Sequence, residues 1–506
     1  MITAWLNQAL IGVDHAVAAR IAGPIGDVIA QAGGQGDDSA LGFSRAMGAL
    51  AACRLAALTL AAPDALPPEP AQDDSNVLPG DHGWSGLLAW VFVEGTPRLQ
   101  HEACMCIAGL PAVMPASVLP AALDAGRRSV ALRPALQSVI GHRGRWLAGF
   151  NDEWRFAADN TTSVVADEDP KRWSEGSLAQ RVDYLHTLRT RDAAAARSLL
   201  QAQLGELPAK ERVELVGVLA QHLGADDEAL LEGLLKDRSR DVRDIAARLL
   251  AQLPTSAHTR RLAGWLAPLL SSKRGLLGKT SWLCDAPQSA DPDWPAAAIS
   301  STRPQHEPLG ERAWWLYQLT RQTTLSWWTA HTGMNATDLI AWAAKTDWKD
   351  ALYRGWRERA GAADKDWLEA MLRATDPEFD RHSAALLALL PVAEREKYWP
   401  RVLDEFSKSG ALGDAVASCA FGETLSIDFS RDLILEAHAF IASDRLRNDY
   451  TLRPQLLELA TILHPGSLSA WHSPARREDG TAAMSECIHA FERIVAARRT
   501  LHTPLS

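Results

Sequence analysis

The fold class is read most directly from Leu230–Leu253, LLEGLLKDRSRDVRDIAARLLAQL. Apolar residues recur at helical spacing in both halves, and the polar run Lys236–Arg238 interrupts them. We expect two short helices around a tight turn, with Ser239 capping the second helix and Pro254 ending it. Helices this short are unstable alone. The stretch therefore predicts that further helices stack before and after it.

Within the second of these helices, Asp244 and Arg248 lie four residues apart. Residues at this spacing are neighbours on a helix surface, so we expect an ion pair on the exposed face. Val242 falls on the apolar face and is expected in the core.

The same stretch is similar to the HEAT-repeat pattern, L-x-x-L-L-x-D-x-x-x-x-V-R-x-x-A-A-x-x-L-x-x-L. The residues that carry the resemblance are Leu231, Leu234, Leu235, Asp237, Val242, Arg243, Ala246, Ala247, Leu250 and Leu253. In HEAT repeats the Asp and the Arg commonly tie successive repeats together. The resemblance therefore implies that Asp237, Val242 and Arg243 are structural joints of a stack and not a functional site.

A broader resemblance rests on Arg143-Gly-Arg-Trp-Leu, on Trp154 and on the span Glu175–Pro254. These features look like an uncharacterised bacterial family of HEAT-like proteins. Genes of that family often lie beside genes for a SWIM zinc-finger protein, a MoxR-type ATPase and a von Willebrand A-domain protein. The resemblance implies a protein partner from this group, the ATPase or the zinc-finger protein first.

The composition of the chain bounds its class. The 506 residues carry 52 basic and 62 acidic side chains, a net charge of −10, which weighs against general nucleic-acid binding. The amino-terminal residues lack the basic region of a signal peptide, and no apolar run is long enough for a membrane span. The 6 scattered cysteines suit a reducing compartment, so we expect a cytoplasmic protein.

The fold class expected from the whole chain is all-α, an α-solenoid of HEAT-like helix pairs with irregular Pro-rich insertions. Trp84–Phe92 fits either a helix or a buried strand. The expected divisions are a helical pair at 1–62, a Pro/Asp-rich linker at 63–83, a helical segment at 84–175, regular HEAT-like repeats at 176–271, an irregular insertion at 272–310 and further helical repeats at 311–506.

Two sets of residues are candidates for an interaction surface. The first is Gly141–Phe150 with Trp154, where a turn presenting Arg143 and Arg145 beside Trp146 could hold a carboxylate or a phosphate. An inter-repeat corner in which these arginines pair with Asp152 and Glu153 is the alternative, and base rates favour it.

The second set is tryptophan-rich. The pairs Trp314-Trp315 and Trp327-Trp328 could grip a peptide or a base from a concave surface. Helix packing, with one member of each pair in the core, is the more common role of such residues.

Other motifs are incomplete. Gly275–Thr280 ends like a phosphate-binding loop, but Lys273 stands where its first glycine is required and a helix is expected before it. Cys104 and Cys106 with His101 lack a fourth metal ligand. We therefore expect no cofactor, no metal and no catalytic residue. The sequence favours a non-catalytic protein-binding scaffold, and the alternative is a HEAT-like enzyme or binder acting on nucleic acid, similar to some DNA glycosylases.

Overall fold

The computed structural model describes residues 24–33, 39–56, 74, 76–78, 83–110, 112–158, 171–274, 280–441, 452–472 and 482–503. Helices dominate this part of the chain, which confirms the all-α class apart from one hairpin. The chain forms two compact units, Met1–Ala71 and Gln72–Ser506. Among the described helices, none is both long and apolar enough to cross a bilayer.

The first unit contains two packed helices, α2 (Pro24–Gly33) and α3 (Ser39–Ala56). Ile29 and Ala46 are the buried residues of their small core. The predicted helical pair at 1–62 includes residues 1–23, 34–38 and 57–62, which lie outside the described residues, as does most of the predicted linker at 63–83.

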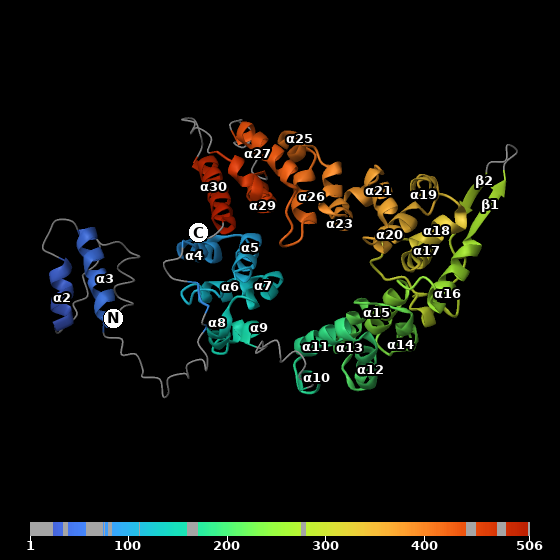
Figure 1. The fold of residues 1–506 in the computed structure, drawn as a ribbon, viewed down its shortest axis with the longest axis horizontal. Helices are drawn as coiled ribbons and strands as arrows, with labels where there is room; N and C mark the ends of the chain where they lie inside the picture. The colour runs from blue at the N-terminus through green and yellow to red at the C-terminus, as the bar shows by residue number, and fades with distance from the viewer. Residues whose placement is uncertain are drawn as a thin grey trace. The chain divides into compact units, whose positions relative to one another are not determined.

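The second unit begins with a group of short helices (Figure 1). They are α4 (Ser85–Glu94), α5 (Pro97–Ala108), α6 (Leu119–Arg128), α7 (Arg133–Gln137), α8 (Gly141–Ala148) and α9 (Arg155–Ala158). The ambiguous segment Trp84–Phe92 is therefore helical. Its residues Leu88, Val91 and Phe92 are fully buried.

The next helices are α10 (Lys171–Ser174), α11 (Leu178–Arg191), α12 (Ala193–Gln203), α13 (Ala209–Gly217), α14 (Glu228–Leu234), α15 (Arg240–Leu250) and α16 (Ala257–Leu266). The two helices expected in Leu230–Leu253 are α14 and α15, and Val242 is fully buried between them and their neighbours.

Two local predictions for this stretch are wrong. Ser239 occupies the N-cap position of α15, but its side chain makes no capping bond. Asp237 forms the turn instead, because its Oδ1 accepts a hydrogen bond from the Ser239 N–H at 2.7 Å. Asp244 pairs with Arg240, at 3.6 Å, and not with Arg248. Arg240 lies one turn before Asp244 on the same face, so it competes for the same carboxylate.

An antiparallel hairpin opens the predicted irregular insertion. Strands β1 (Leu270–Arg274) and β2 (Thr280–Cys284) pair with Leu270 opposite Cys284 and Arg274 opposite Thr280. The polar run of β1 hides the alternation that would mark a strand, so the sequence did not predict it. Residues 275–279 of the incomplete phosphate-loop motif lie outside the described residues. Thr280 and Lys273 lie in the two strands.

Helices resume after the insertion. They are α17 (Glu311–Gln322), α18 (Leu325–Thr332), α19 (Ala336–Ala343), α20 (Lys349–Arg359), α21 (Lys365–Arg373), α22 (Pro377–Asp380), α23 (Ser383–Ala388), α24 (Val392–Arg395), α25 (Leu403–Lys408), α26 (Ala411–Ser418), α27 (Ile427–Ile441), α29 (Leu452–Ile462) and α30 (Ala482–His502). Helix α18 was not expected from the sequence, and α22 and α23 divide a segment expected as one helix.

Polar side chains link helices that are separated in sequence. Several linked residues are separated by 27 to 31 positions, among them Arg181–Glu211, Arg197–Asp227, Arg261–Glu232, Lys349–Asp376, Ser383–Asp414, Arg395–Glu423 and Arg401–Asp432. Other links have different spacings, such as Arg212–Asp237 at 25 positions and Arg189–Asp227 at 38.

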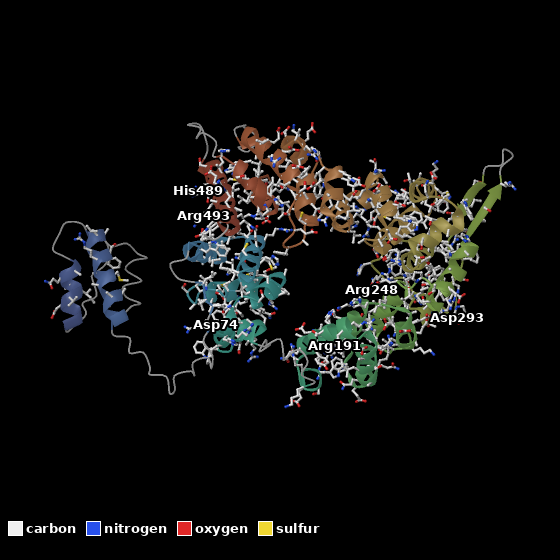
Figure 2. The ribbon with its side chains drawn as sticks, viewed as in Figure 1. Asp74, Arg191, Arg248, Asp293, His489 and Arg493 are labelled. Carbon is white, nitrogen blue, oxygen red and sulfur yellow. The ribbon has the colours of Figure 1, made fainter. Side chains whose placement is uncertain are left out.

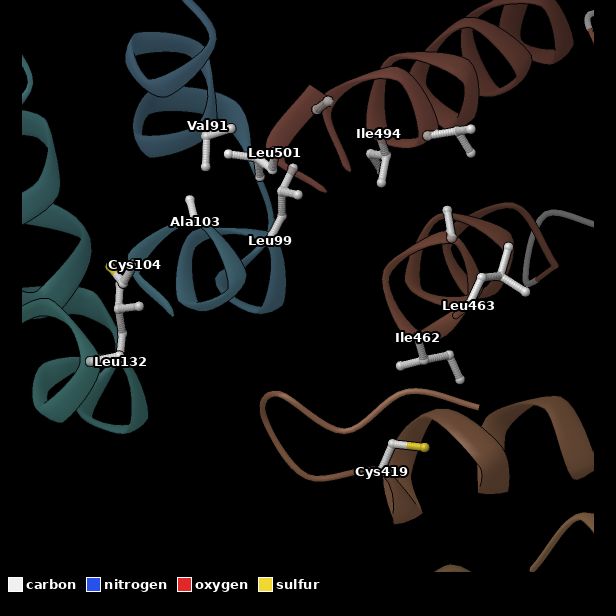
Figure 3. Packing of buried hydrophobic residues seen from close by; sticks show 14 of the residues in the cluster. Val91, Leu99, Ala103, Cys104, Leu132, Cys419, Ile462, Leu463, Ile494 and Leu501 are labelled. Atoms are coloured by element: carbon white, nitrogen blue, oxygen red, sulfur yellow. The ribbon is translucent and has the colours of Figure 1, made fainter. Parts of the chain in front are cut away.

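The beginning of the second unit also packs against its end. Leu99 and Val91 share one core with Leu501 and Ile494 (Figure 3). Arg498, which is fully buried, donates to both carboxylate oxygens of Glu102 on α5, at 2.6 and 2.8 Å. In a linear array of repeats each unit contacts only its neighbours, so this contact between helices almost 400 residues apart is an additional feature.

Candidate functional site

A cleft lies between α15 and the helices that follow the insertion. Its volume is about 1010 Å³. Helix α15 contributes Asp241, Asp244 and Arg248, the end of α17 contributes Arg321, and the end of α20 contributes Arg359. The loop at 360–364 and the amino-terminal end of α18 complete the wall. Figure 2 labels Arg248 beside α15.

Two polar contacts hold the walls of this cleft together. The Nη2 group of Arg359 donates to the Ala251 carbonyl, at 3.0 Å, and thereby joins α20 to the end of α15. On α16, the fully buried His258 shares a hydrogen bond of 3.0 Å with Gln322, the last residue of α17. Burial lowers the pKa of His258 to about 4, so this imidazole is neutral at pH 7.

A second cleft of about 620 Å³ continues from the first. The two clefts share Ser326, Ala363 and Asp364. The second extends past the start of α19 and along α21 as far as Arg373. We call the two together the α15–α21 groove. Its combined length along several helices suits an extended polypeptide better than a compact small molecule.

Most carboxylates of the groove already have partners. Glu358 accepts hydrogen bonds from Tyr317 and from Arg354, the latter at 3.1 Å, and Asp364 accepts from the Gly361 N–H at 2.9 Å. Burial and the contact with Glu358 raise the pKa of Tyr317, so its hydroxyl keeps its proton and donates.

Two arginines of the groove are not neutralised in this way. Arg248 is exposed and forms no hydrogen bond or ion pair with any residue that the structure describes. Arg359 is half-buried, and its only hydrogen bond within the described part of the chain goes to the Ala251 carbonyl. Burial lowers the pKa of Arg359, with Asp364 acting in the opposite direction. These guanidinium groups leave positive charge available to a ligand.

The predicted arginine turn at Gly141–Phe150 is a helix, α8, and this part of the prediction is wrong. Asp74 caps the amino-terminal end of α8. Its two carboxylate oxygens accept hydrogen bonds from the backbone N–H groups of His142 and Arg143, at 2.7 and 3.1 Å. Residues two apart on a helix point in widely different directions. The side chains of Arg143, which is exposed, and Arg145, which is half-buried, therefore do not form one clamp.

The remaining residues of this candidate surface have partners inside the protein. Arg145 donates to the Gln137 carbonyl, and the ring of Trp146 meets that of Phe150 edge-on with centroids 4.9 Å apart. Trp154 donates from Nε1 to Asp124, at 3.0 Å.

Asp152 and Glu153, the expected partners of Arg143 and Arg145, pair with other arginines. Asp152 contacts Arg155 at 2.8 Å and Glu153 contacts Arg127 at 3.6 Å. These contacts favour a structural corner over a ligand site.

The tryptophan pairs lie in or against one core. Trp314, Trp315 and Trp328 are buried, and Trp327 is half-buried with its ring stacked on His331 at 4.6 Å. The Trp315 Nε1 group donates to the Ser301 carbonyl at 2.9 Å. Burial favours the packing interpretation for the first three. Whether Trp327 contacts a partner stays a prediction.

The three residues proposed as joints lie in or beside the turn before α15. Asp237 accepts from Arg212 on α13, at 2.9 Å, and so connects α13 to the turn before α15. Arg243 donates to the carbonyl of Asp237, at 2.7 Å. Val242 packs in the same core.

The described residues contain no group of three or more His, Cys, Asp or Glu side chains that could hold a metal ion. Cys104 and Cys106 are free thiols, and burial raises the pKa of Cys104 far above its usual value. His502 contacts Cys106 and Glu102, which together raise the pKa of this imidazole to about 9.

A family model matches residues 4–505, almost the whole chain, and its description is a family of unknown function, DUF5691. The chain belongs to the DUF5691 family. No curated protein matches it, and no solved structure matches it.

The sequence did not single out the groove of this DUF5691 chain. Arg248 was expected to pair with Asp244, whereas Arg321 and Arg359 belong to helices between which sequence periodicity shows no contact. In the structure all three arginines stand in the last turn of a helix, α15, α17 or α20. Helix ends come together where units stack, so such residues are candidates for a shared surface.

Proposed function

We propose that this DUF5691 chain is a non-catalytic protein–protein interaction scaffold. In this proposal α11–α16 and α17–α30 are HEAT-like repeats of an α-solenoid, and the α15–α21 groove holds an extended segment of a partner protein. The links between side chains 27 to 31 residues apart support the repeats.

The observation that carries the proposal is the continuity of the groove. Two clefts of about 1010 and 620 Å³ meet at Ser326, Ala363 and Asp364. Polypeptide segments bind in grooves of this kind, with side chains seated along successive helices. The groove also carries the carboxylates Asp241, Asp244, Glu358 and Asp364, which would repel a phosphate backbone. This supports a protein ligand over a nucleic acid.

The resemblance described above suggests which proteins to test. A MoxR-type ATPase and a SWIM zinc-finger protein are the proposed partners, in a bacterial multi-protein system in the cytoplasm. An assembly of this kind would use the chain to hold one partner in reach of another.

The experiment is a comparison of partner capture by two forms of the full chain. Ala363, which is exposed and lies where the two clefts meet, is replaced by Trp to block the groove. Arg238→Trp, at an exposed position outside both clefts, is the matched control. Each form is purified from its own host with bound proteins identified by mass spectrometry, and is also tested against the purified ATPase and zinc-finger protein.

We expect the unmodified chain and Arg238→Trp to retain one partner in stoichiometric amount, and Ala363→Trp to lose it. Equal retention by all three forms would show that the groove is not the binding site. Absence of any stoichiometric partner from the unmodified chain would contradict the scaffold itself.

A further inference from the structure

The cleft of about 1010 Å³ has more free positive than free negative charge, although its formal charges nearly balance. Among the described residues, neither Arg248 nor Arg359 forms a hydrogen bond or an ion pair with a carboxylate, although Asp364 acts electrostatically on Arg359. Of the carboxylates, Glu358 is engaged by Tyr317 and Arg354, and Asp364 by a backbone N–H. A charged group that is partly removed from water without a partner is costly, so an anion arriving beside Arg359 recovers part of that cost.

One carboxylate of this cleft is also free. Asp241 is exposed, stands in the first turn of α15 and has no partner among the described residues. It lies seven residues before Arg248, which is about 10 Å along a helix. The free charges on α15 therefore differ in sign between its two ends, and the arginines define the anion-binding end.

A helix terminus adds donors at the same end of the groove. Helix α18 starts at Leu325, and Thr324 before it makes no side-chain cap. The Ser326 hydroxyl donates to Thr324 Oγ1, at 3.3 Å, rather than accepting from a backbone N–H. The first N–H groups of a helix carry partial positive charge and favour an anion. Thr324, Leu325 and Ser326 all line the cleft that also contains Arg248 and Arg359.

We infer that the groove recognises an acidic side chain in an extended protein segment, and that the carboxylate is held by Arg248, Arg359 and the amino-terminal end of α18. This inference rests on the proposed function and specifies the chemistry of its partner. A carboxylate fits better than a phosphate, because Glu358 and Asp364 line the same cleft and repel a second negative charge.

The net charge of −10 makes the inference easy to test. A polyanion is repelled by such a protein as a whole, so its binding must come from a local positive site. The probe is fluorescein-labelled oligoglutamate, with oligolysine and a phosphoserine peptide of the same length for comparison. Binding is followed by fluorescence anisotropy on the full chain at low and at physiological salt.

The variant is Arg248→Glu, and the matched control is Arg238→Glu. Both arginines are exposed, and neither side chain has a partner among the described residues, so both variants are expected to fold. We expect the unmodified chain to bind oligoglutamate. Arg248→Glu should weaken binding by about tenfold or more, while Arg238→Glu changes it by less than about twofold.

Three results would overturn the inference. One is equal weakening of oligoglutamate binding by Arg248→Glu and Arg238→Glu, which would show general electrostatic attraction without a specific site. Another is tighter binding of the phosphoserine peptide, which would assign the site to phosphate. The third is loss of oligoglutamate binding in Arg248→Glu with partner capture unchanged. In that last case the scaffold role stands as long as Ala363→Trp still abolishes capture, whereas unchanged capture by Ala363→Trp would remove the groove function itself.

Discussion

The helices before and after the β1–β2 hairpin build their cores differently. In α11–α15, which we call the aliphatic region, the core consists mainly of Leu, Val, Ile and Ala. Arg189, Arg212 and Asp227 are buried there as well. In α17–α23, the tryptophan region, Trp314, Trp315, Trp328, Trp356 and Trp367 are buried, and the described residues include no buried Asp, Glu, Lys or Arg.

The difference shows two ways to join helices. In the aliphatic region, guanidinium groups reach across helix ends and satisfy carbonyls that the helices leave unpaired: Arg189 donates to the carbonyls of Ala193, Gln221 and His222 as well as to Asp227. In the tryptophan region, large rings fill irregular volume, and the indole N–H groups of Trp314, Trp328 and Trp356 are buried without a hydrogen bond. The groove lies where the two regions meet.

The largest expected effect comes from Arg189→Ala. Arg189 and Asp227 are almost completely buried, so the substitution leaves a buried carboxylate with one partner fewer and several carbonyls unpaired. The loss of stability in α11–α14 should be ~5 kcal/mol, because removing one member of a buried ion pair is strongly destabilising. Peptide-level hydrogen exchange measures it region by region.

Arg240→Ala is the control for this substitution, because Arg240 pairs with Asp244 on the surface and is expected to contribute less than ~1 kcal/mol. Similar losses of protection in both variants would contradict the role of buried charge in the aliphatic region.

A slightly smaller effect is expected for Trp356→Ala in the tryptophan region. Trp356 is fully buried and meets the rings of Trp328 and Trp367 with centroids 5.2 and 5.1 Å apart. The cavity should cost ~4 kcal/mol, measured by hydrogen exchange in α17–α21. Trp327→Ala removes a half-buried ring and should cost ~1 kcal/mol. Equal losses of stability in the two variants would contradict the placement of Trp356 in the core and of Trp327 at its edge.

The boundary between the two regions should weaken in acid. Burial lowers the pKa of His258 to about 4, below its value in an unfolded chain. The unfolded state therefore binds more protons between about pH 6.5 and pH 4, and stability falls as the pH is lowered through that range. For this single group the loss should approach ~3 kcal/mol.

Thermal unfolding at several pH values checks this expectation. His258→Asn should flatten the pH dependence in this range, and His306→Asn, at an exposed position, should leave it unchanged. An unchanged slope in His258→Asn would mean that another group controls the acid response.

The regular parts of the fold could be predicted from the sequence, and the contacts between them could not. Helical spacing located α14, α15 and most later helices, because an apolar stripe is a local property of the chain. The same reasoning missed the contact of Arg498 with Glu102, since nothing local links residues so far apart. It also missed the hairpin, whose strand β1 has one buried residue, Leu270.

The candidate site was hardest to predict because charge partners depend on tertiary structure. Arg143 and Arg145 were candidates because they are close in sequence, yet on helix α8 their side chains point in different directions. The i, i+4 rule predicted that Arg248 pairs with Asp244, but Asp244 pairs with Arg240 instead. Arg248 and Arg359 are far apart in sequence, and they line one cleft because the Arg359–Ala251 contact joins α20 to the end of α15.

The most direct test of the central claim is a photo-crosslink from the groove in living cells. A benzophenone amino acid replaces Ala363 in one form of the full chain and Arg238 in another, and crosslinked proteins are identified by mass spectrometry. If the groove holds a partner, one dominant crosslinked protein is expected from position 363 and none from position 238. Two results would contradict a partner bound in the groove. One is the same crosslinked products from both positions. The other is no product from position 363 while a partner still co-purifies.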